Sequence, residues 1–361
     1  MTTEPTRLPD FPWDVLAPFG ERAGRHPGGL VDLSVGTPVD PTPELVQAAL
    51  RAASNAPGYP TAAGRPELRE ACARWLARSH GSVVAPGAIL PAIGSKELVA
   101  ALPRLLGVRP GDRVAIPRIA YPTYAVGVIL AGAEPVPTDR PETVDGAALA
   151  WLNSPGNPTG EVMAPERMAE IVAWARETGA VVASDECYIE LGWEASPRSL
   201  LHPEVSGGSH DGVLAIHSLS KRSNLAGYRF GFVAGDPGIV ATMLGIRKHS
   251  GMMVPAPVQA AAIAALDDDA HVLEQRERYA GRRRVLIGAL TGAGFRIDRS
   301  EAGLYLWATR DEPCWDTVAW FADRGILVTP GDFYGQAGAD HVRIALTATD
   351  EQVGTAAERL R

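Results

Sequence analysis

The chain has 361 residues, of which 46% are hydrophobic, enough for one large domain with a substantial core or for two smaller ones. Its formal net charge of −8 argues against a general nucleic-acid-binding surface and against binding to anionic membranes. The three cysteines, Cys72, Cys187 and Cys314, are scattered without C-x-x-C spacing, so they predict neither a disulfide framework nor a metal site and suit a reducing compartment.

The N-terminal segment, residues 1–30, is rich in proline, glycine and charge, and we expect it to form an arm that packs on another part of the chain. It contains no apolar signal-peptide core, and no run of 18 apolar residues occurs anywhere in the chain, which indicates a cytoplasmic protein. The pattern then predicts a strand over 31–35 and helices over 43–50 and 66–79.

Apolar strands alternate with helical stretches through the middle of the chain. The expected strands are 88–93, 113–116, 149–152, 180–183, 213–216 and 229–234, and the expected helices are 96–106, a stretch ending at 131, and 165–177. This alternation predicts an α/β fold with a mainly parallel sheet covered by helices on both faces.

The pattern of predicted elements changes near residue 270, where a long charged helix is followed by short strands and further helical stretches. This pattern predicts a smaller α+β domain at the C-terminal end. We therefore divide the chain into an N-terminal segment, 1–36, a large domain, 37–270, and a small domain, 271–361.

The most informative stretch follows the expected strand 213–216. Lys221 lies at the mouth of that strand, where partial desolvation makes the neutral amine accessible for attack on a carbonyl carbon. Ser218, Ser220 and Arg229 supply hydroxyl donors and a guanidinium fork, which suit a phosphate. An amine beside phosphate ligands predicts a site for an aldehyde that carries a phosphate, and pyridoxal phosphate is the commonest such cofactor.

Other interpretations of this stretch remain open. Lys221 taken alone is a solvated loop lysine more often than a catalytic one. Ser218 to Lys221 also fits the S-x-x-K motif of serine acyl-enzymes, but the S-D-N and K-T-G motifs that accompany it are absent from the chain. A dinucleotide oxidoreductase is disfavoured because no G-x-G-x-x-G follows an early strand.

Polar residues follow several other expected strands, and ligands of open α/β sheets bind beyond the carboxyl ends of the strands. Gly94-Ser95 opens a helix and would offer N–H groups and a hydroxyl to a phosphate. Tyr121 could stack on a flat ring, and Asn157 lies at another strand end. Asp185 could hold a proton on a pyridine nitrogen, with Tyr188 beside a phenolic oxygen. Taken alone, Gly94-Ser95 is a helix cap more often than an anion site, and Tyr121 is usually a packing residue. Asp185 is about as often a turn residue or a helix cap, and Asn157-Pro158 is a common turn signal, so the prediction depends on their common location.

Three motifs carry a family resemblance. Asn157 to Gly160 (NPTG), Ser184 to Tyr188 (SDECY) and Ser218 to Arg229 (SLSKRSNLAGYR) resemble the class I and II aminotransferases, which are fold-type I pyridoxal-phosphate enzymes. The resemblance extends from about residue 31 to 346 and makes 37–270 the cofactor-binding domain. It implies that Lys221 bonds to the cofactor and moves a proton at the substrate Cα, with Asp185 and Tyr188 as further catalytic residues.

The resemblance also implies two sets of binding residues and a homodimer with shared active sites. The implied cofactor-binding residues are Gly94, Ser95, Lys96, Tyr121, Asn157, Asp185, Tyr188, Ser218, Ser220, Lys221, Arg229 and, reaching the partner subunit's phosphate, Tyr59. The implied substrate-binding residues are Gly36, Asn157, Lys96 and Arg343, with Arg343 on the α-carboxylate of the substrate. The partners it implies are small molecules, namely amino-acid and 2-oxo-acid substrates.

Within the family, stretches such as LSVGTPVDPTP and HSLSKRSNLAGYR look closest to actinobacterial-type N-succinyldiaminopimelate aminotransferases of lysine and diaminopimelate biosynthesis. That activity transfers an amino group to 2-oxoglutarate from a substrate with several carboxylates, so it needs cations besides Arg343. Lys96 is the first candidate, and the others are Arg65, Arg222, Arg247 and Lys248.

Related activities stay open as well. Cofactor-holding motifs do not separate this substrate from aspartate, alanine, aromatic amino acids or unsuccinylated diaminopimelate. β-Elimination or decarboxylation on the same cofactor is also compatible with Lys221 and Asp185. An aminotransferase-like transcription regulator is disfavoured, because the segment before residue 31 is too short for a winged helix.

Overall fold

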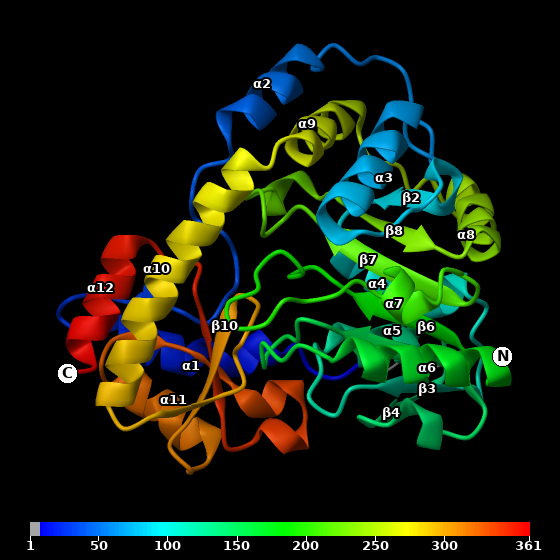
Figure 1. The fold of residues 1–361 in the computed structure, drawn as a ribbon. Helices are drawn as coiled ribbons and strands as arrows, with labels where there is room; N and C mark the ends of the chain where they lie inside the picture. The colour runs from blue at the N-terminus through cyan, green and yellow to red at the C-terminus, as the bar shows by residue number, and fades with distance from the viewer. Residues whose placement is uncertain (1–7) are drawn as a thin grey trace, which may run out of the picture.

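The computed structural model describes residues 8–361. Its largest sheet has seven strands in the order β2-β8-β7-β6-β5-β3-β4 (Figure 1). Six of them run parallel, and β8 runs antiparallel to both of its neighbours, so the predicted mainly parallel α/β sheet is confirmed. The strands are β2 (Ile89–Ala92), β3 (Arg113–Ile116), β4 (Glu134–Pro137), β5 (Ala147–Asn153), β6 (Val181–Asp185), β7 (Val213–Ser218) and β8 (Gly231–Gly235).

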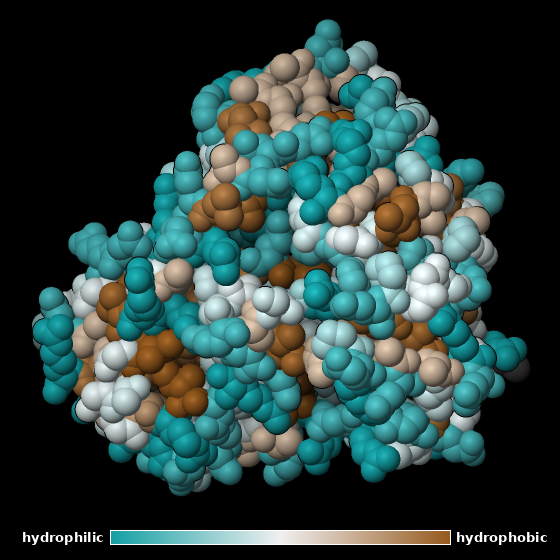
Figure 2. All heavy atoms as spheres, viewed as in Figure 1, coloured by the Kyte–Doolittle hydropathy of each residue, from teal (hydrophilic) through white to brown (hydrophobic). Residues whose placement is uncertain are grey.

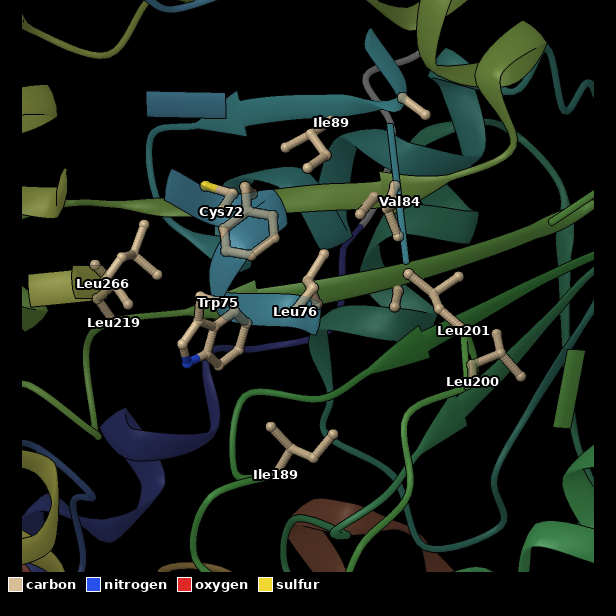
Figure 3. Packing of buried hydrophobic residues seen from close by; sticks show 14 of the residues in the cluster. Cys72, Trp75, Leu76, Val84, Ile89, Ile189, Leu200, Leu201, Leu219 and Leu266 are labelled. Atoms are coloured by element: carbon tan, nitrogen blue, oxygen red, sulfur yellow. The ribbon is translucent and has the colours of Figure 1, made fainter. Parts of the chain in front are cut away.

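The apolar run that opens β7 is buried on both faces of this sheet. Val213 and Ala215 contact one hydrophobic cluster, whereas Leu214 and Ile216 contact another on the opposite face. Side chains alternate between faces along a strand, so an uninterrupted apolar run is what a strand covered by helices on both sides requires. Figure 3 shows the first cluster, to which the helix α3 contributes Trp75.

Helices cover both faces of the seven-stranded sheet. On the face of Val213 lie α3 (Pro66–His80), α6 (Pro165–Thr178) and α9 (Ala256–Asp267). On the face of Leu214 lie α4 (Ser95–Leu105), α5 (Thr123–Leu130) and α8 (Pro237–Ser250). The sequence had indicated neither α8 nor α9.

A second sheet of four antiparallel strands, in the order β12-β13-β10-β9, belongs to the C-terminal part of the chain. The strands are β9 (Arg296–Asp298), β10 (Tyr305–Thr309), β12 (Thr329–Pro330) and β13 (Val342–Ala345). The helices around it are α10 (Ala270–Gly292), α11 (Cys314–Ala322) and α12 (Asp350–Arg359).

Residues 8–35 join this C-terminal part. They form the helix α1 (Pro12–Gly24), which packs on α11, and the strand β1 (Val31–Asp32), which pairs in parallel with β11 (Ile326–Leu327). In Figure 1 the blue α1 lies beside the orange and red helices of the other end of the chain. The hydrophobic cluster there includes Leu16 of α1.

The remaining helices are short or peripheral. In Figure 1, α2 (Glu44–Ala52) lies at the outer end of the molecule beside α9, and α7 (Pro203–Ser206) is a single turn. Figure 2 shows a mostly hydrophilic face with apolar groups gathered over the C-terminal part. Among the helices of residues 8–361, none combines the length and apolar character that crossing a membrane requires.

Candidate active site

A cavity of about 750 Å³ lies where the seven-stranded sheet meets the C-terminal part. One wall is formed by the carboxyl ends of β5, β6 and β7 together with the first turn of α4. The opposite wall is formed by residues 35–37, β10 and β13. The residues singled out from the sequence that line it are Gly36, Ser95, Lys96, Tyr121, Asn157, Asp185, Tyr188, Ser218, Ser220, Lys221, Arg229 and Arg343.

Two predicted site residues do not line this cavity. Gly94 directly precedes Ser95, the first residue of α4, and a Cβ added to it would collide with the guanidinium of Arg229. Tyr59 is 96% exposed in the loop between α2 and α3, away from the cavity of its own chain.

Four of the five candidate cations for the distal carboxylates also lie elsewhere. Arg222 and Arg247 are buried and form ion pairs with Glu190 and Glu97. The remaining two, Arg65 and Lys248, are likewise absent from the cavity lining, so only Lys96 keeps this candidacy.

Lys221 is held in the cavity by the loop that follows β7. Its Nζ donates a hydrogen bond to the carbonyl oxygen of Gly36, on the opposite wall. Burial lowers the pKa of Lys221, and the nearby Arg343 and Arg229 lower it further, although Tyr305 opposes the shift. A lysine with a lowered pKa supplies the neutral amine that nucleophilic attack on a carbonyl needs.

Asp185 ends β6 and is buried at the base of the cavity. Its Oδ2 accepts a hydrogen bond of 3.0 Å from the hydroxyl of Tyr124, and its Oδ1 accepts one of 3.2 Å from the backbone N–H of Cys187. The pKa of Asp185 is raised overall by burial, and these hydrogen bonds offset part of the shift. The carboxylate is thus fixed in orientation and is positioned to hold a proton on a basic ring nitrogen.

The first turn of α4 and the loop after β7 form an anion-binding corner. Gly94 has a φ of +94°, and a Cβ at this position would collide with the Arg229 guanidinium, so only glycine lets the two segments approach. The hydroxyl of Ser218 donates to that of Ser220 over 3.0 Å. A helix N-terminus, hydroxyls and a guanidinium are together a suitable set of ligands for a phosphate.

Arg343 belongs to β13, in the wall opposite Lys221, and its buried side chain lines the cavity. Its Nη1 donates to Asn157 Oδ1 over 3.0 Å, and its Nη2 donates to the carbonyl oxygen of Ser34 over 2.5 Å. The guanidinium lies 4.1 Å from the centroid of the Tyr305 ring. These contacts fix the plane of the guanidinium, which suits bidentate recognition of a carboxylate.

The charges of the cavity are strongly unbalanced. Among the described residues it is lined by Lys96, Lys221, Arg229 and Arg343, against the single carboxylate of Asp185. Within residues 8–361, no salt bridge joins any of these four cations to a carboxylate. Cations without acidic partners in an acidic protein indicate ligands with several negative charges.

Sequence reasoning missed several lining residues. The hydroxyl of Tyr305 lies 3.2 Å from that of Tyr188, and Phe11 and Trp13 of the N-terminal segment also line the cavity. Tyr124 also lines the cavity and was missed, although the sequence could have indicated it, because it lies in the same YPTY string as Tyr121. No local pattern marks Phe11, Trp13 or Tyr305, since distant parts of the chain bring them to the cavity.

Comparison with known families assigns the chain. The family described as aminotransferase class I and II matches residues 29–360. The chain belongs to this family. Class I and II aminotransferases use pyridoxal 5′-phosphate and act on amino-acid and 2-oxo-acid substrates, so the cofactor predicted from the sequence is confirmed.

Individual relatives of this aminotransferase differ in substrate. It is 59% identical over 355 residues to a 4-dedimethylamino-4-oxo-anhydrotetracycline transaminase of Streptomyces rimosus, covering 98% of this chain and 99% of the relative. It is also 59% identical over 356 residues to a probable aminotransferase of Mycobacterium tuberculosis, covering 98% and 85%. Identity to an LL-diaminopimelate aminotransferase of Aquifex aeolicus is 36% over 358 residues, covering 92% and 91%.

Solved structures of aminotransferases share the fold. An aminotransferase from Neisseria meningitidis superposes with a TM-score of 0.90 at 31% identity, covering 98% of this chain and 97% of that one. A probable N-succinyldiaminopimelate aminotransferase from Thermus thermophilus gives a TM-score of 0.87 at 28% identity, covering 97% and 99%.

The side chains of the cavity fit pyridoxal phosphate. The anion-binding corner around Ser95 and Arg229 suits the phosphate, the Asp185 carboxylate suits the pyridine nitrogen, and the Lys221 amine suits the aldehyde. The cradle that Gly94 leaves open supports this fit, because any larger residue would push the Arg229 guanidinium away.

Proposed function

We propose that this aminotransferase transfers the amino group of N-succinyl-L,L-2,6-diaminopimelate to 2-oxoglutarate, in lysine and diaminopimelate biosynthesis. The observation that carries the proposal is the set of cations in the cavity that form no salt bridge within residues 8–361. Arg229 suits the cofactor phosphate and Arg343 an α-carboxylate, which leaves Lys96 for a further anion at the distal end of the substrate.

The position of Lys96 also favours an acylated substrate over free diaminopimelate. Free diaminopimelate carries an ammonium at its distal end, and Lys96 would repel that charge. Succinylation removes the ammonium and adds a carboxylate, so the same lysine attracts the modified end. The Thermus thermophilus structure, of a probable N-succinyldiaminopimelate aminotransferase, supports a succinylated substrate, whereas the Aquifex aeolicus relative is named for unacylated diaminopimelate.

Pyridoxal phosphate held by Lys221, Asp185 and Arg229 would supply an acceptor for the amino group and would withdraw electrons from the substrate Cα. In the proposed mechanism the Lys221 amine would take the proton from the substrate Cα and deliver it to the C4′ carbon of the cofactor, so that the amino group leaves the substrate with the cofactor. Asp185 keeps a proton on the pyridine nitrogen, while Tyr188 and Asn157 bind the phenolic oxygen of the ring. Tyr121 stacks on the ring.

The remaining roles are binding roles. The backbone of Gly94, the hydroxyls of Ser95, Ser218 and Ser220, and the Arg229 guanidinium bind the phosphate. Arg343 binds the substrate α-carboxylate, and Gly36 closes over the substrate. A Cβ at Gly36 would collide with the Tyr305 ring, which supports the need for glycine at this position.

We further propose a cytoplasmic homodimer with the domain boundaries expected from the sequence, in which Tyr59 binds the cofactor phosphate of the partner subunit. The 96% exposure of Tyr59, outside the cavity of its own chain, supports this role. Mixing subunits of Tyr59→Ala and Lys221→Ala tests it, because a mixed dimer regains one intact site. Recovery of about a quarter of the wild-type activity after unfolding and refolding the mixture is expected, and no recovery would contradict shared sites.

A second candidate activity is amination of a tetracycline-type ketone. The 59% identity to the Streptomyces rimosus transaminase favours it, as do the aromatic side chains of Phe11, Trp13 and Tyr305 in the cavity. A flat polycyclic ketone would pack well against such side chains.

The experiment that tests the proposal compares kcat/KM for several amino donors with 2-oxoglutarate as acceptor. We expect N-succinyl-L,L-diaminopimelate to exceed unacylated diaminopimelate, aspartate, alanine and phenylalanine by about 100-fold. A preference for any of these four donors, or for 4-dedimethylamino-4-oxo-anhydrotetracycline as acceptor with glutamate, would contradict it. Lys96→Ala should raise KM for the succinylated donor about tenfold, whereas the control Lys248→Ala, outside the cavity, should not.

A further inference from the structure

The ammonium of Lys96 lies between two aromatic rings at the mouth of the cavity. Its Nζ is 5.9 Å from the centroid of the Phe11 ring and 5.9 Å from that of the Tyr121 ring. These distances are within the range of cation–π attraction. The two rings belong to segments that are more than 100 residues apart in the chain, so the arrangement is a product of the fold.

Phe11 keeps this place although its own side chain is 55% exposed. It directly precedes α1, whose Leu16 is buried against the C-terminal part. The Phe11 ring lies 5.6 Å from the Trp13 ring, which in turn lies 5.9 Å from the ring of Phe333. An exposed phenylalanine that lines a cavity and contacts a cation there is better explained by a ligand than by the core.

We propose that Phe11, together with Trp13, determines the substrate specificity of this aminotransferase by forming a distal subsite around Lys96. The subsite takes an extended substrate arm that is apolar along its length and anionic at its end. Phe11 acts as a positioning residue, because it holds the Lys96 ammonium toward the cavity. The inference builds on the proposed function, which assigns Lys96 to a distal carboxylate, and extends it to the N-terminal segment.

The physical basis is the flexibility of lysine. Lys96 is exposed and, within residues 8–361, forms no salt bridge, so a free side chain would sample many rotamers in water. Two flanking rings restrict these rotamers and partly desolvate the ammonium, which strengthens its attraction for a carboxylate. The rings of Phe11 and Trp13 also give the methylene groups of the substrate an apolar surface.

The test uses a series of L-2-amino dicarboxylic acids of increasing length, with L-alanine as the donor that lacks a distal anion. The measurement is the rate constant of the half-reaction, followed by cofactor absorbance with the holoenzyme and without an acceptor. In the wild type we expect the rate constant at low donor concentration to rise from 2-aminoadipate to 2-aminopimelate. Phe11→Ala should lower it for 2-aminopimelate about five- to tenfold and leave it within twofold for alanine.

Matched variants separate positioning from packing. Phe11→Tyr keeps an aromatic face and should keep the preference for the long dicarboxylate, whereas Phe11→Leu keeps apolar volume only and should lose it. Val15→Ala, on the exposed side of α1 and outside the cavity, should behave as the wild type. Equal loss with alanine and 2-aminopimelate in Phe11→Ala, no loss with either, or a wild type without length preference would each overturn the inference.

This series also distinguishes the two proposals. Failure of the proposed function would appear as poor turnover of the succinylated donor by the wild-type enzyme. Failure of the distal subsite would appear as a length preference that Phe11→Ala leaves unchanged, whatever the result with the succinylated donor.

Discussion

The hydroxyl of Tyr188, beyond the end of β6, lies 3.2 Å from the hydroxyl of Tyr305, the first residue of β10. The Tyr305 ring also stacks against the guanidinium of Arg343, 4.1 Å from its centroid. Tyr305 therefore links the proposed ring-binding tyrosine to the proposed carboxylate-binding arginine across the two walls of the cavity.

This link predicts an effect of Tyr305→Phe on both groups. Loss of a hydrogen bond of this kind is worth about 1 kcal/mol, so kcat/KM should fall about fivefold. In a double-mutant cycle with Tyr188→Phe the two losses should not add, because each variant removes the same hydrogen bond. Strict additivity of the two effects would show that the hydroxyls act independently.

Substitution of Lys221 tests the covalent role of its amine. Reduction of the wild-type holoenzyme with borohydride should fix the cofactor to the peptide that contains Lys221, and mass spectrometry should locate it there. Lys221→Ala should show no fixed cofactor and should lose about 10²- to 10⁴-fold in kcat, the range for a missing general base. Attachment at another lysine would contradict the assignment.

Gly94 should be sensitive to the addition of a single methyl group. Its φ is +94°, and a Cβ would collide with the Arg229 guanidinium, so Gly94→Ala should weaken binding of pyridoxal phosphate as well as the fold. Gly107→Ala is the matched control, because Gly107 has a φ of +77° but nothing within 4 Å of an added Cβ. Fluorescence titration of the apo forms should show at least about a tenfold weaker Kd for Gly94→Ala only.

The buried side chain of Glu186, directly after β6, should make stability depend on pH. Burial raises the pKa of Glu186 from its ordinary 4.5 to about 7, although the backbone N–H of Leu200 donates to its Oε1 over 2.7 Å. Between pH 4.5 and 7 the unfolded chain releases this proton while the folded protein keeps it, so stability falls as pH rises. The loss approaches about 3 kcal/mol above pH 7.

Glu186→Gln removes this titration and keeps an oxygen for Leu200. The quantity to follow is the free energy of unfolding of the variant minus that of the wild type, measured with denaturant. This difference should increase from pH 5 to pH 8, because only the wild type loses stability as Glu186 titrates. The comparison cancels the opposing effect of the buried His80, whose pKa is lowered by burial in both proteins. The pKa of His217 is also lowered by burial, but its ring lies 3.6 Å from the Glu186 carboxylate, so any change in its titration is part of the measured difference. A difference between the two proteins that does not change with pH would show that Glu186 does not titrate in this range.

The sequence predicted the strands that are buried on both faces, because apolar runs such as 213–216 have no other stable location. It did not indicate β4, whose four residues include Pro135 and Pro137. Proline cannot donate to a strand ladder, and β4 tolerates it because it is an edge strand that pairs with β3 alone. The reversed direction of β8 was equally invisible, since local pattern carries no information on strand direction.

The residues of the candidate site were likewise predicted where a local sequence signal exists and missed or misassigned where it does not. Lys221, Asp185 and Arg229 follow strands or loops with clear local signals, and all of them line the cavity. Arg222 was a candidate because it adjoins Lys221, yet its side chain is buried away from the cavity beside Glu190. Neighbouring residues of a loop that leaves a sheet often point to opposite sides, so nearness in sequence was misleading.

The pairing of β1 with β11 has a consequence for biosynthesis. Val31 pairs with Ile326, and the carbonyl oxygen of Ser34 accepts a hydrogen bond from Arg343, 309 residues later, so one wall of the cavity joins segments that are synthesised far apart in time. At about 5–20 residues per second, the N-terminal segment waits on the order of 15–60 s for its partners. The strands around Lys221 need no such delay. The nascent protein should therefore acquire the means to hold its cofactor well before it can select a substrate.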